Sequence, residues 1–346
     1  MINSHLLYQL SYSGIPARKL FPPKPAIKRL HGYHWRHDAT PGIIAVHPQH
    51  TCMPAQQHTT TPATATAPAP RTSRHTRRPL ALVTGASSGI GRHLAQGLAA
   101  RGYDLALVAR REELLIQLAA TLHEAYGTHC YPIAADLARY EERERVVTAL
   151  APHAAQLAVL INNAGFGTHG YFHETNLERE LELIAVNCAA PVHLTKRILP
   201  WMLARHEGYI LNVASVSSFM PGPVMAIYYA SKAFLLSFSE ALHEEYRHRG
   251  IRVTALCPGP VRTEFQRTAG ILGSARSSIA SPMDAAPVAE AGLKALFAGK
   301  RVETPGLANK AVALAGRLLP RRWMLHWVRD IQEERRRQTR LATEGH

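Results

Sequence analysis

Short apolar runs alternate with amphipathic helical stretches from Leu80 onward, and this alternation limits the possible folds more than any other feature. The predicted strands are 80–85, 104–110, 129–137, 157–165, 208–215, 251–259 and 301–306. Helices are predicted between them at 89–102, 111–127, 139–153 and near 179–205. Continuous apolar runs of about four to eight residues are typical of strands that are buried on both faces. Because strands that alternate with helices form right-handed crossovers, we predict an α/β fold with a doubly wound parallel sheet in a single domain.

The chain on either side of this core differs in composition. Residues 1–78 are rich in proline and histidine, and residues 59–70 read TTTPATATAPAP, which is typical of a flexible low-complexity segment. We predict that 1–78 is disordered, and three origins stay open: a disordered tail, an organelle-targeting peptide, or translation upstream of a true start at Met53. The core domain is predicted at 79–306, and a basic, amphipathic helical extension at 307–346.

The net charge of +15 would suit a nucleic-acid binder, but its distribution argues against one. The excess of Lys and Arg lies in residues 1–78 and 317–346, whereas the predicted core is nearly neutral. A nucleic-acid groove needs its charge on the folded body. The four cysteines are far apart and form no zinc-type cluster, so we expect a reducing compartment, a cytoplasmic protein and no metal site. No apolar run approaches the length of a membrane span.

A glycine-rich turn, TGASSGIG at 84–91, lies between the first predicted strand and the first predicted helix. In that setting the pattern is typical of a dinucleotide-binding turn in a Rossmann-type sheet. Gly85 and Gly89 would let the backbone approach a pyrophosphate, and Gly91 would let helix and strand pack closely. The helix N-terminus adds N–H groups and a partial positive charge. The alternative is a purely structural turn.

The end of the second predicted strand indicates which dinucleotide is bound. An NAD site usually has a carboxylate there for the ribose 2′-hydroxyl, but this sequence reads Val108-Ala109-Arg110-Arg111. Arg110 would pair with a 2′-phosphate through charge-assisted hydrogen bonds. We therefore predict NADP(H) rather than NAD(H); the alternative is that Arg110 is a solvated residue at the start of a helix.

The stretch SVSSFMPGPVMAIYYASKAF (215–234) holds the candidate catalytic groups. Tyr228 is four residues and Tyr229 three residues before Lys232, so on a helix either tyrosine would share a face with the lysine. A nearby ammonium group lowers a tyrosine pKa toward the range useful in acid–base catalysis. We expect this effect at Tyr228, and we expect a serine hydroxyl at the end of the preceding strand to bind a substrate carbonyl oxygen.

Taken in order, these motifs resemble the short-chain dehydrogenase/reductase superfamily, in its branch with TGxxxGIG and YxxxK. The match runs through TGxxxGIG (84–91), Asp136, NNAG (162–165), Asn187, the serine strand, YxxxK (228–232) and PGPVRT (258–263), and covers residues 80 to about 306. The resemblance implies an oxidoreductase that interconverts carbonyl and alcohol groups, with hydride from the nicotinamide and a proton from Tyr228.

The resemblance also assigns roles to single residues. The family's serine–tyrosine spacing points to Ser215 rather than Ser217 or Ser218, and Tyr229 takes the variable position, where it packs or lines the pocket. Asn187 would bend the long helix and hold a water that relays protons to Lys232. The implied catalytic residues are Asn187, Ser215, Tyr228 and Lys232. The implied cofactor-binding residues are Gly85, Ser87, Ser88, Gly89, Ile90, Gly91, Arg110, Asp136, Asn163, Ala164, Gly165, Tyr228, Lys232, Pro258, Gly259 and Thr263.

Residues 264–281, which follow Thr263, are expected to form a mobile lid that selects the substrate. Phe265, Ile271 and Leu272, with Phe219 and Met220 opposite, indicate an apolar pocket and hence a lipophilic ketone or aldehyde. The alternative is ordinary loop packing. The family resemblance also implies a homodimer or homotetramer, built from the helices that begin near 179 and 228.

The extension is predicted as two helical pieces separated by Pro320. Trp323, Met324, Trp327, Val328 and Ile331 form an apolar stripe beside Arg321, Arg322 and Arg329. This pattern is typical either of a helix packed on its own domain or a partner subunit, or of a helix lying on an anionic membrane.

Three other functions are weighed against an NADP-dependent reductase. A non-catalytic dinucleotide sensor or scaffold would be expected to lack Tyr228 or Lys232, and both are present. A nucleic-acid binder would use the two basic ends and would bind in a salt-sensitive way. A sugar epimerase shares YxxxK, but its glycine loop has a different spacing.

Overall fold

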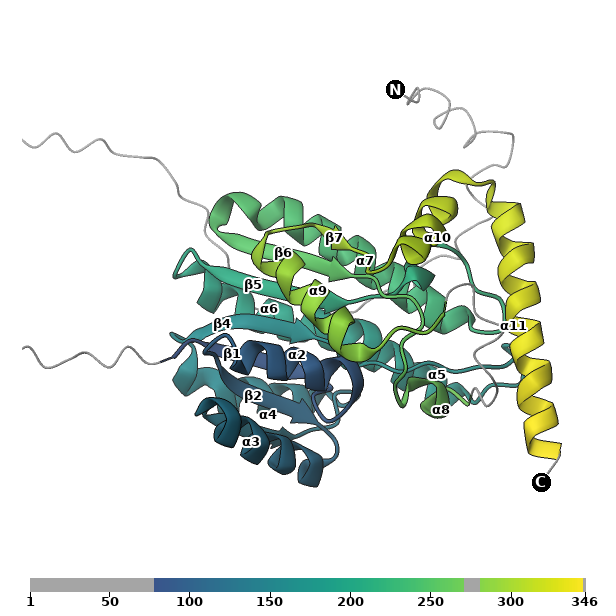
Figure 1. Cartoon of the computed structure of the whole chain (residues 1–346). Helices are drawn as coiled ribbons and strands as arrows, with labels where there is room; N and C mark the ends of the chain where they lie inside the picture. Colours follow the sequence, from purple (N-terminus) through teal and green to yellow (C-terminus); the bar gives the residue numbers. More distant parts are fainter. Residues whose placement is uncertain (1–77, 271–280, 345–346) are drawn as a thin grey trace, which may run out of the picture. The chain divides into compact units, whose positions relative to one another are not determined.

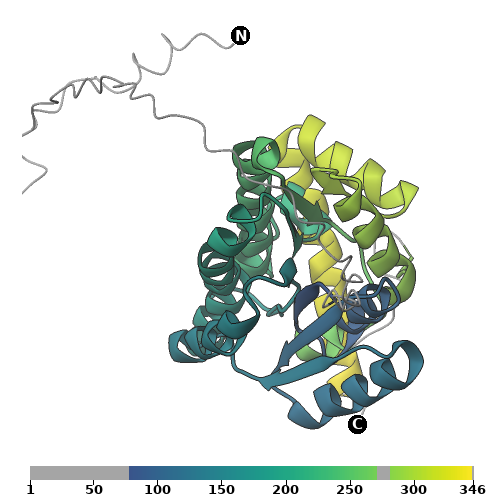
Figure 2. The same cartoon turned by 90° about the vertical axis from the view of Figure 1, so that its left-hand side faces the viewer.

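Described residues 78–270 and 281–344 of the computed structural model form a parallel sheet with helices on both faces (Figure 1, Figure 2). The strands are β1 (Leu80–Thr84), β2 (Asp104–Ala109), β3 (Cys130–Ala134), β4 (Leu157–Asn162), β5 (Gly208–Val213), β6 (Ile251–Leu256) and β7 (Val302–Glu303). Their order is β3-β2-β1-β4-β5-β6-β7, and all neighbours are parallel. The predicted fold class is confirmed. Each strand ends one to three residues earlier than predicted, because the residues that follow already belong to the loops at the carboxyl edge of the sheet.

The strands are buried from both sides, which explains their continuous apolar sequences. In β1, Ala81 and Val83 face one core with α2 (Gly89–Ala99), α3 (Glu112–Tyr126) and α9 (Ala285–Phe297). Leu80 and Leu82 face the opposite core with α4 (Tyr140–Leu150), α6 (Ala190–Leu203) and α7 (Ala226–Tyr246). Short 3-10 segments lie at η2 (Ala151–His153), η4 (Val216–Phe219) and η5 (Arg247–Arg249).

The order of the strands reverses at β1, which has β2 on one side and β4 on the other. In open parallel sheets, ligands bind beyond the carboxyl ends of the strands at such a switch point. The loops after β1 and β4, which carry the glycine-rich turn and the NNAG sequence, therefore meet where a ligand is expected.

The helix predicted near 179–205 is interrupted. It consists of α5 (Leu177–Ile184), a π-helical segment η3 (Ala185–Ala189) and α6. Asn187 lies in the middle of the π-helical segment. Such segments are rare and frequently occur at functional sites, so the interruption draws attention to Asn187.

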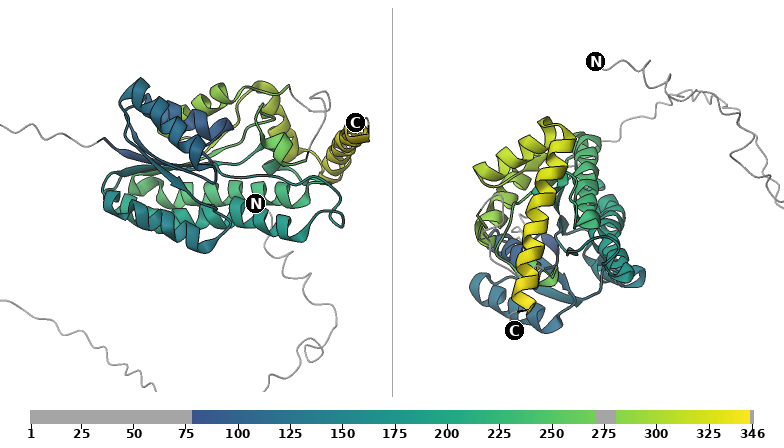
Figure 3. Two further views of the ribbon diagram at one scale, coloured as in Figure 1. Left: turned by 90° about the horizontal axis from the view of Figure 1, so that it is seen from below. Right: turned by 90° about the vertical axis from the view of Figure 1, so that its right-hand side faces the viewer.

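The C-terminal part forms α10 (Leu307–Leu318) and α11 (Arg321–Glu344), with Pro320 between them as predicted. Helix α11 runs past the edge of the domain at which α5 and α8 (Phe265–Thr268) lie (Figure 1, Figure 3). Met324 and Val328 pack into one cluster with Phe166, Tyr228 and Tyr229.

The apolar stripe predicted on α11 is divided between two faces. Met324 and Val328 are buried, whereas Trp323 and Trp327 remain 57% and 37% exposed. The two tryptophans lie about 100° around the helix from the buried residues, since adjacent helical positions differ by that angle. No helix in the described ranges is long and apolar enough to cross a membrane.

Some predictions concern residues that the structure does not describe. The predicted disorder of 1–78 falls outside the described residues except at Arg78, and the lid residues Ile271 and Leu272 fall outside them as well.

Candidate active site

A cavity of about 800 Å³ lies beyond the carboxyl ends of the strands. It brings together nearly all the predicted site residues from seven separate segments, namely the six loops that follow β1 to β6 and the first turns of α7. Those that line it are Gly85, Ser87, Ser88, Gly89, Ile90, Arg110, Asp136, Asn163, Ala164, Gly165, Ser215, Tyr228, Lys232, Pro258, Gly259 and Thr263. Gly91 and Asn187 do not line the cavity but lie behind its wall.

The glycine-rich turn has the backbone shape that its sequence predicts. Gly85 and Gly89 have φ values of 65° and 56°, a region that disfavours residues with a Cβ atom. A Cβ on Gly91 would lie 2.2 Å from the carbonyl oxygen of Gly85, so only glycine fits there. The N-cap residue Ser88 makes no side-chain capping bond, which leaves N–H groups of the α2 N-terminus open to an anion.

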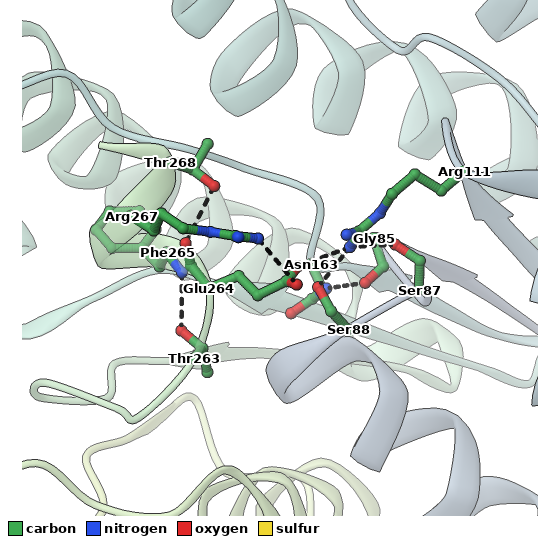
Figure 4. Close-up of polar contacts among 10 residues, drawn as sticks. All are labelled: Gly85, Ser87, Ser88, Arg111, Asn163, Thr263, Glu264, Phe265, Arg267 and Thr268. Carbon is green, nitrogen blue, oxygen red and sulfur yellow. Dashed lines mark hydrogen bonds and ion pairs between the residues drawn. The ribbon is translucent and has the colours of Figure 1, made fainter. Parts of the chain in front are cut away.

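Asn163 holds the loop after β4 against the glycine-rich turn. Its side-chain nitrogen donates to the carbonyl oxygen of Thr84 at 2.9 Å. It also donates to the carbonyl oxygen of Gly85 at 3.2 Å (Figure 4). The Thr84 hydroxyl in turn accepts from the backbone N–H groups of Asn163 and Ala164. These bonds fix the floor of the cavity before any ligand binds. The floor and the open helix end therefore fit the pyrophosphate of a dinucleotide.

Two arginines lie at the outer end of this floor. Arg110 lines the cavity, as predicted, but the following residue makes the more informative contacts. The Arg111 guanidinium donates to the hydroxyls of Ser87 at 3.2 Å and Ser88 at 3.1 Å, and to the Glu264 carboxylate at 2.8 Å (Figure 4). Sequence reasoning missed Arg111, although its position next to Arg110 was a signal. The bond from Arg111 holds the pKa of Glu264 below its ordinary value.

The candidate reacting groups meet at the inner end of the cavity. Ser215 follows β5 and accepts from the Ser217 N–H at 3.1 Å, while Tyr228 lies in the first turn of α7. Burial raises the pKa of Tyr228 to about 12, and a hydrogen bond with Ser215 partly offsets this increase. The tyrosine is therefore neutral at physiological pH and holds a proton that it can donate.

Lys232 lies one helical turn beyond Tyr228. Its ammonium nitrogen donates to the carbonyl oxygen of Val213 at 2.8 Å and lies 5.9 Å from the centre of the Tyr228 ring. Burial lowers the pKa of Lys232 to about 8. The expected lowering of the Tyr228 pKa is wrong as a net effect for this structure, because burial of the tyrosine raises its pKa more than its polar neighbours lower it.

Asn187 supports this centre from behind. Its side chain accepts from the Phe166 N–H at 3.2 Å and donates to the Phe166 carbonyl and to the Ser231 hydroxyl, both at 3.0 Å. A Cβ on Gly165 would lie 3.0 Å from the Asn187 oxygen and 3.4 Å from the Lys232 nitrogen. The π-helical turn thus places Asn187 near Lys232, and the proton relay between them stays a prediction.

The remaining wall of the cavity is mostly apolar. Phe166, Met225, Phe265 and Val312 line it together with the ring of Tyr229. Phe219 and Met220, which were expected in this wall, do not line the cavity. Phe219 instead packs against α10, where a Cβ on Gly316 would lie 3.0 Å from the Phe219 Cβ. Met220 is buried in the apolar cluster that contains Tyr229 and Met324.

Helix α11 supplies a part of the wall that sequence reasoning missed. Gln332, Arg335 and Gln338 line the same cavity as Tyr228. The Gln332 amide donates to the Tyr229 hydroxyl at 2.9 Å. The only sequence signal was their common face with Met324 and Val328, about one turn apart along the helix.

Comparison with known proteins connects this geometry to a family. The profile described as short chain dehydrogenase matches residues 79–270, which is more than half of the chain. The chain belongs to the short-chain dehydrogenase family. Membership makes it an oxidoreductase with a Rossmann-type fold and a nicotinamide dinucleotide site, as predicted.

Individual family members are similar over the same region. A very-long-chain 3-oxoacyl-CoA reductase from Anas platyrhynchos is 36% identical over 192 residues, which cover 54% of this chain and 61% of that protein. The human protein of the same name is 33% identical over 191 residues, with the same coverage. The match thus spans about three-fifths of the length of these relatives.

Solved structures of short-chain dehydrogenases cover more of the chain. One from Sphingobium yanoikuyae in complex with NADPH has 36% identity and a TM-score of 0.63, covering 69% of this chain and 92% of that one. A bulky-bulky ketone specific alcohol dehydrogenase from Comamonas testosteroni has 31% identity and a TM-score of 0.59, with coverages of 75% and 92%.

Proposed function

We propose that this short-chain dehydrogenase is an NADP-dependent reductase of ketones or aldehydes on lipophilic substrates, with Tyr228 as the general acid. The observation that carries the proposal is the convergence of Ser215, Tyr228 and Lys232 on the cavity that also contains the glycine-rich turn. A nicotinamide bound there would supply the hydride.

The residues of the chain would handle the proton. The hydroxyls of Ser215 and Tyr228 would both donate to the substrate carbonyl oxygen and so orient it. As negative charge develops on that oxygen, Tyr228 gives up its proton. The Lys232 ammonium would stabilise the resulting phenolate, and Asn187 would support proton resupply from behind Lys232. A neutral tyrosine at physiological pH favours this reductive direction.

The proposed preference for NADP over NAD rests on the two arginines at the outer end of the cavity floor. Arg110 and Arg111 lie where an NAD site usually has a carboxylate, and Arg111 is held against the hydroxyls of Ser87 and Ser88. A 2′-phosphate is a good ligand for two guanidinium groups and two hydroxyls. The NADPH complex of the Sphingobium relative supports the same choice.

The substrate class rests on the apolar wall. Phe166, Met225, Phe265 and Val312 suit an alkyl chain or a ring system beside the reacting carbonyl. The names of the relatives support this proposal, since one is a very-long-chain 3-oxoacyl-CoA reductase and another a bulky-bulky ketone specific alcohol dehydrogenase. A reductase of this kind would be a ketoreductase.

The test is oxidation of NADPH by purified full-length protein, measured as loss of nicotinamide absorbance. The panel pairs short and long ketones and aldehydes, with NADH as the comparison cofactor and Tyr228→Phe as the control variant. We expect turnover that increases with the length of the apolar chain and is lost in Tyr228→Phe, while that variant still binds NADPH. Tight NADPH binding without turnover on any carbonyl would instead favour the non-catalytic sensor or scaffold.

We also propose that the protein is a homo-oligomer through α5 and α7, which pack side by side. Leu181, Ile184 and Phe234 leave large apolar side chains exposed on these helices. Light scattering after gel filtration should show a dimer or tetramer, and Leu181→Glu should shift it toward monomer. Ile116→Glu, at an exposed apolar residue of α3, is the control, and an unchanged mass for Leu181→Glu would contradict this interface.

A further inference from the structure

Helix α11 is held in one rotational setting against the cavity. Met324 and Val328 anchor its first turns in the cluster that contains Tyr228 and Tyr229. Farther along, Gln332 donates to the Tyr229 hydroxyl, and Arg336 pairs with Glu174 at 2.6 Å. These contacts lie on both sides of Arg335 in the sequence, so they determine which way Arg335 faces. Arg335 lies in the wall of the cavity that contains Tyr228.

The guanidinium of Arg335 lacks a partner within residues 78–270 and 281–340, where it forms no hydrogen bond or ion pair. Other arginines of α11 differ in this respect, because Arg329, Arg336 and Arg337 pair with Asp330, Glu174 and Glu334. Arg335 is partly buried, and burial lowers its pKa. The groups that raise the pKa of Arg335 again are Tyr229 and Tyr228, and no carboxylate in the described part of the chain contributes. A partly buried cation without a counter-charge is costly unless a ligand neutralises it.

The neighbours of Arg335 along the helix point to the same part of the cavity. Gln332 is 1% exposed, and its side-chain oxygen has no hydrogen-bond partner among the described residues. The side-chain oxygen of Gln338 is likewise buried without a partner in the described ranges. Buried polar atoms are normally paired in native proteins. Three polar groups with unmet hydrogen-bonding capacity thus occur about one turn apart in a wall that is otherwise apolar.

We propose that Arg335 determines substrate specificity by binding an anionic oxygen group, such as a carboxylate, on the same molecule whose carbonyl lies between Ser215 and Tyr228. This inference rests on the proposed function and narrows its substrate class to amphiphilic oxo compounds with an apolar body and an anionic end. The planar guanidinium can bind a carboxylate with two parallel hydrogen bonds. The unpaired side-chain oxygens of Gln332 and Gln338 lie on the same helix face and would accept hydrogen bonds from O–H or N–H groups next to the anion.

The inference is tested first by binding, which does not depend on turnover. Calorimetry on full-length protein saturated with NADP⁺ compares decanoate with decanol in the wild type, in Arg335→Gln and in Arg337→Gln. Arg337 is the matched control, because it lies on the same helix and pairs with Glu334 outside the cavity. Decyl phosphate, as a third ligand, shows whether the site prefers a carboxylate or a phosphate.

We expect Arg335→Gln to lower the affinity for decanoate relative to decanol by about 10- to 100-fold, as loss of a hydrogen bond to a charged group predicts. Arg337→Gln should leave this ratio unchanged. Equal decanoate affinity in the wild type and Arg335→Gln, or no decanoate binding by the wild type, would overturn the anion site. Weaker NADP⁺ binding by Arg335→Gln to the same extent would also overturn it, since Arg335 would then serve the cofactor.

Kinetics separate the anion site from the proposed function. We compare kcat/KM for 5-oxodecanoate with kcat/KM for its methyl ester. In Arg335→Gln the ratio of the two should fall about 10- to 100-fold, because KM for the anionic substrate rises. In Arg335→Lys the ratio should recover in part, since the positive charge is restored. A structural role for Arg335 would instead reduce both rates together. If the wild type reduces neither compound while decanoate binding still depends on Arg335, the proposed function fails and the anion site stands.

Discussion

At the scale of single residues, the ionisation of Tyr228 and Lys232 predicts how carbonyl reduction depends on pH. The pKa of Tyr228 is raised to about 12, so its proton is present across pH 6 to 9. The pKa of Lys232 is lowered to about 8, so its positive charge is present below that pH and is lost as the pH rises through it. We expect kcat for reduction to be level below about pH 7 and to fall toward tenfold per pH unit above about pH 8.

The matched variant for this prediction is Lys232→Arg. A guanidinium stays charged throughout this range, so its kcat should be lower but should not fall near pH 8. Steady-state rates at saturating NADPH and substrate measure both profiles. The same decline in Lys232→Arg would assign the titration to a group other than Lys232.

Arg111 gives a second prediction at this scale, which concerns the choice of cofactor. Arg111→Ala should reduce the preference for NADPH over NADH by about tenfold, because it removes one charged hydrogen bond to a 2′-phosphate. Glu264→Gln should act in the opposite direction, since Glu264 competes with the phosphate for the same guanidinium. Fluorescence titration of both cofactors measures the preference. Arg101→Ala, which breaks an ion pair with Glu290, is the control, and an equal loss of NADH binding in Arg111→Ala would contradict this role.

At the scale of secondary-structure elements, the π-helical turn predicts a link between stability and catalysis. Asn187→Ala would leave the buried N–H and C=O of Phe166 without a partner and would remove the bond to the Ser231 hydroxyl, which keeps its bond to the Tyr228 carbonyl. We expect the free energy of unfolding to fall by about 1–3 kcal/mol and kcat to fall as well. Denaturant unfolding and steady-state rates measure the two effects. Asn187→Asp keeps the acceptor for Phe166 but removes both donated bonds, so wild-type behaviour in that variant would show that the donated bonds are dispensable.

The same scale shows what sequence can and cannot predict in this chain. Gly85, Gly89 and Gly91 could be placed from sequence because strand, turn and helix are contiguous there, and local sterics determine the conformation. A tyrosine on the same helix face as Lys232 could be predicted for the same reason, but only the family resemblance chose Tyr228 over Tyr229. The entry of Arg335 into the cavity could not be predicted, because it depends on the packing of α11 against Tyr229 of α7 and against Glu174, both more than 100 residues away in sequence. The division of the tryptophan stripe had the same cause, since only the fold determines which side of α11 faces the domain.

At the scale of the whole molecule, the outer surface of α10 and α11 predicts contact with a membrane. Leu314, Leu318, Trp323 and Trp327 are exposed there, and the neighbouring Arg321 and Arg322 are exposed as well. Apolar side chains next to basic ones suit the surface of an anionic bilayer. A protein that binds lipophilic substrates would gain from this position, because the same helix forms a wall of the cavity.

Flotation of full-length protein with vesicles tests this contact. We expect binding to vesicles that contain phosphatidylserine and about tenfold weaker binding to neutral ones, since each basic residue near an anionic surface contributes about 1 kcal/mol. The double variant Trp323→Gln, Trp327→Gln should lose binding but keep the cavity, because both side chains point away from the buried face of α11. Removal of the chain after Gly306 is a poorer test, because it also removes Met324, Val328 and Arg335 from the domain. Ile116→Gln, at an exposed apolar residue of α3, is the control, and full flotation of the tryptophan variant would show that α11 serves the active site alone.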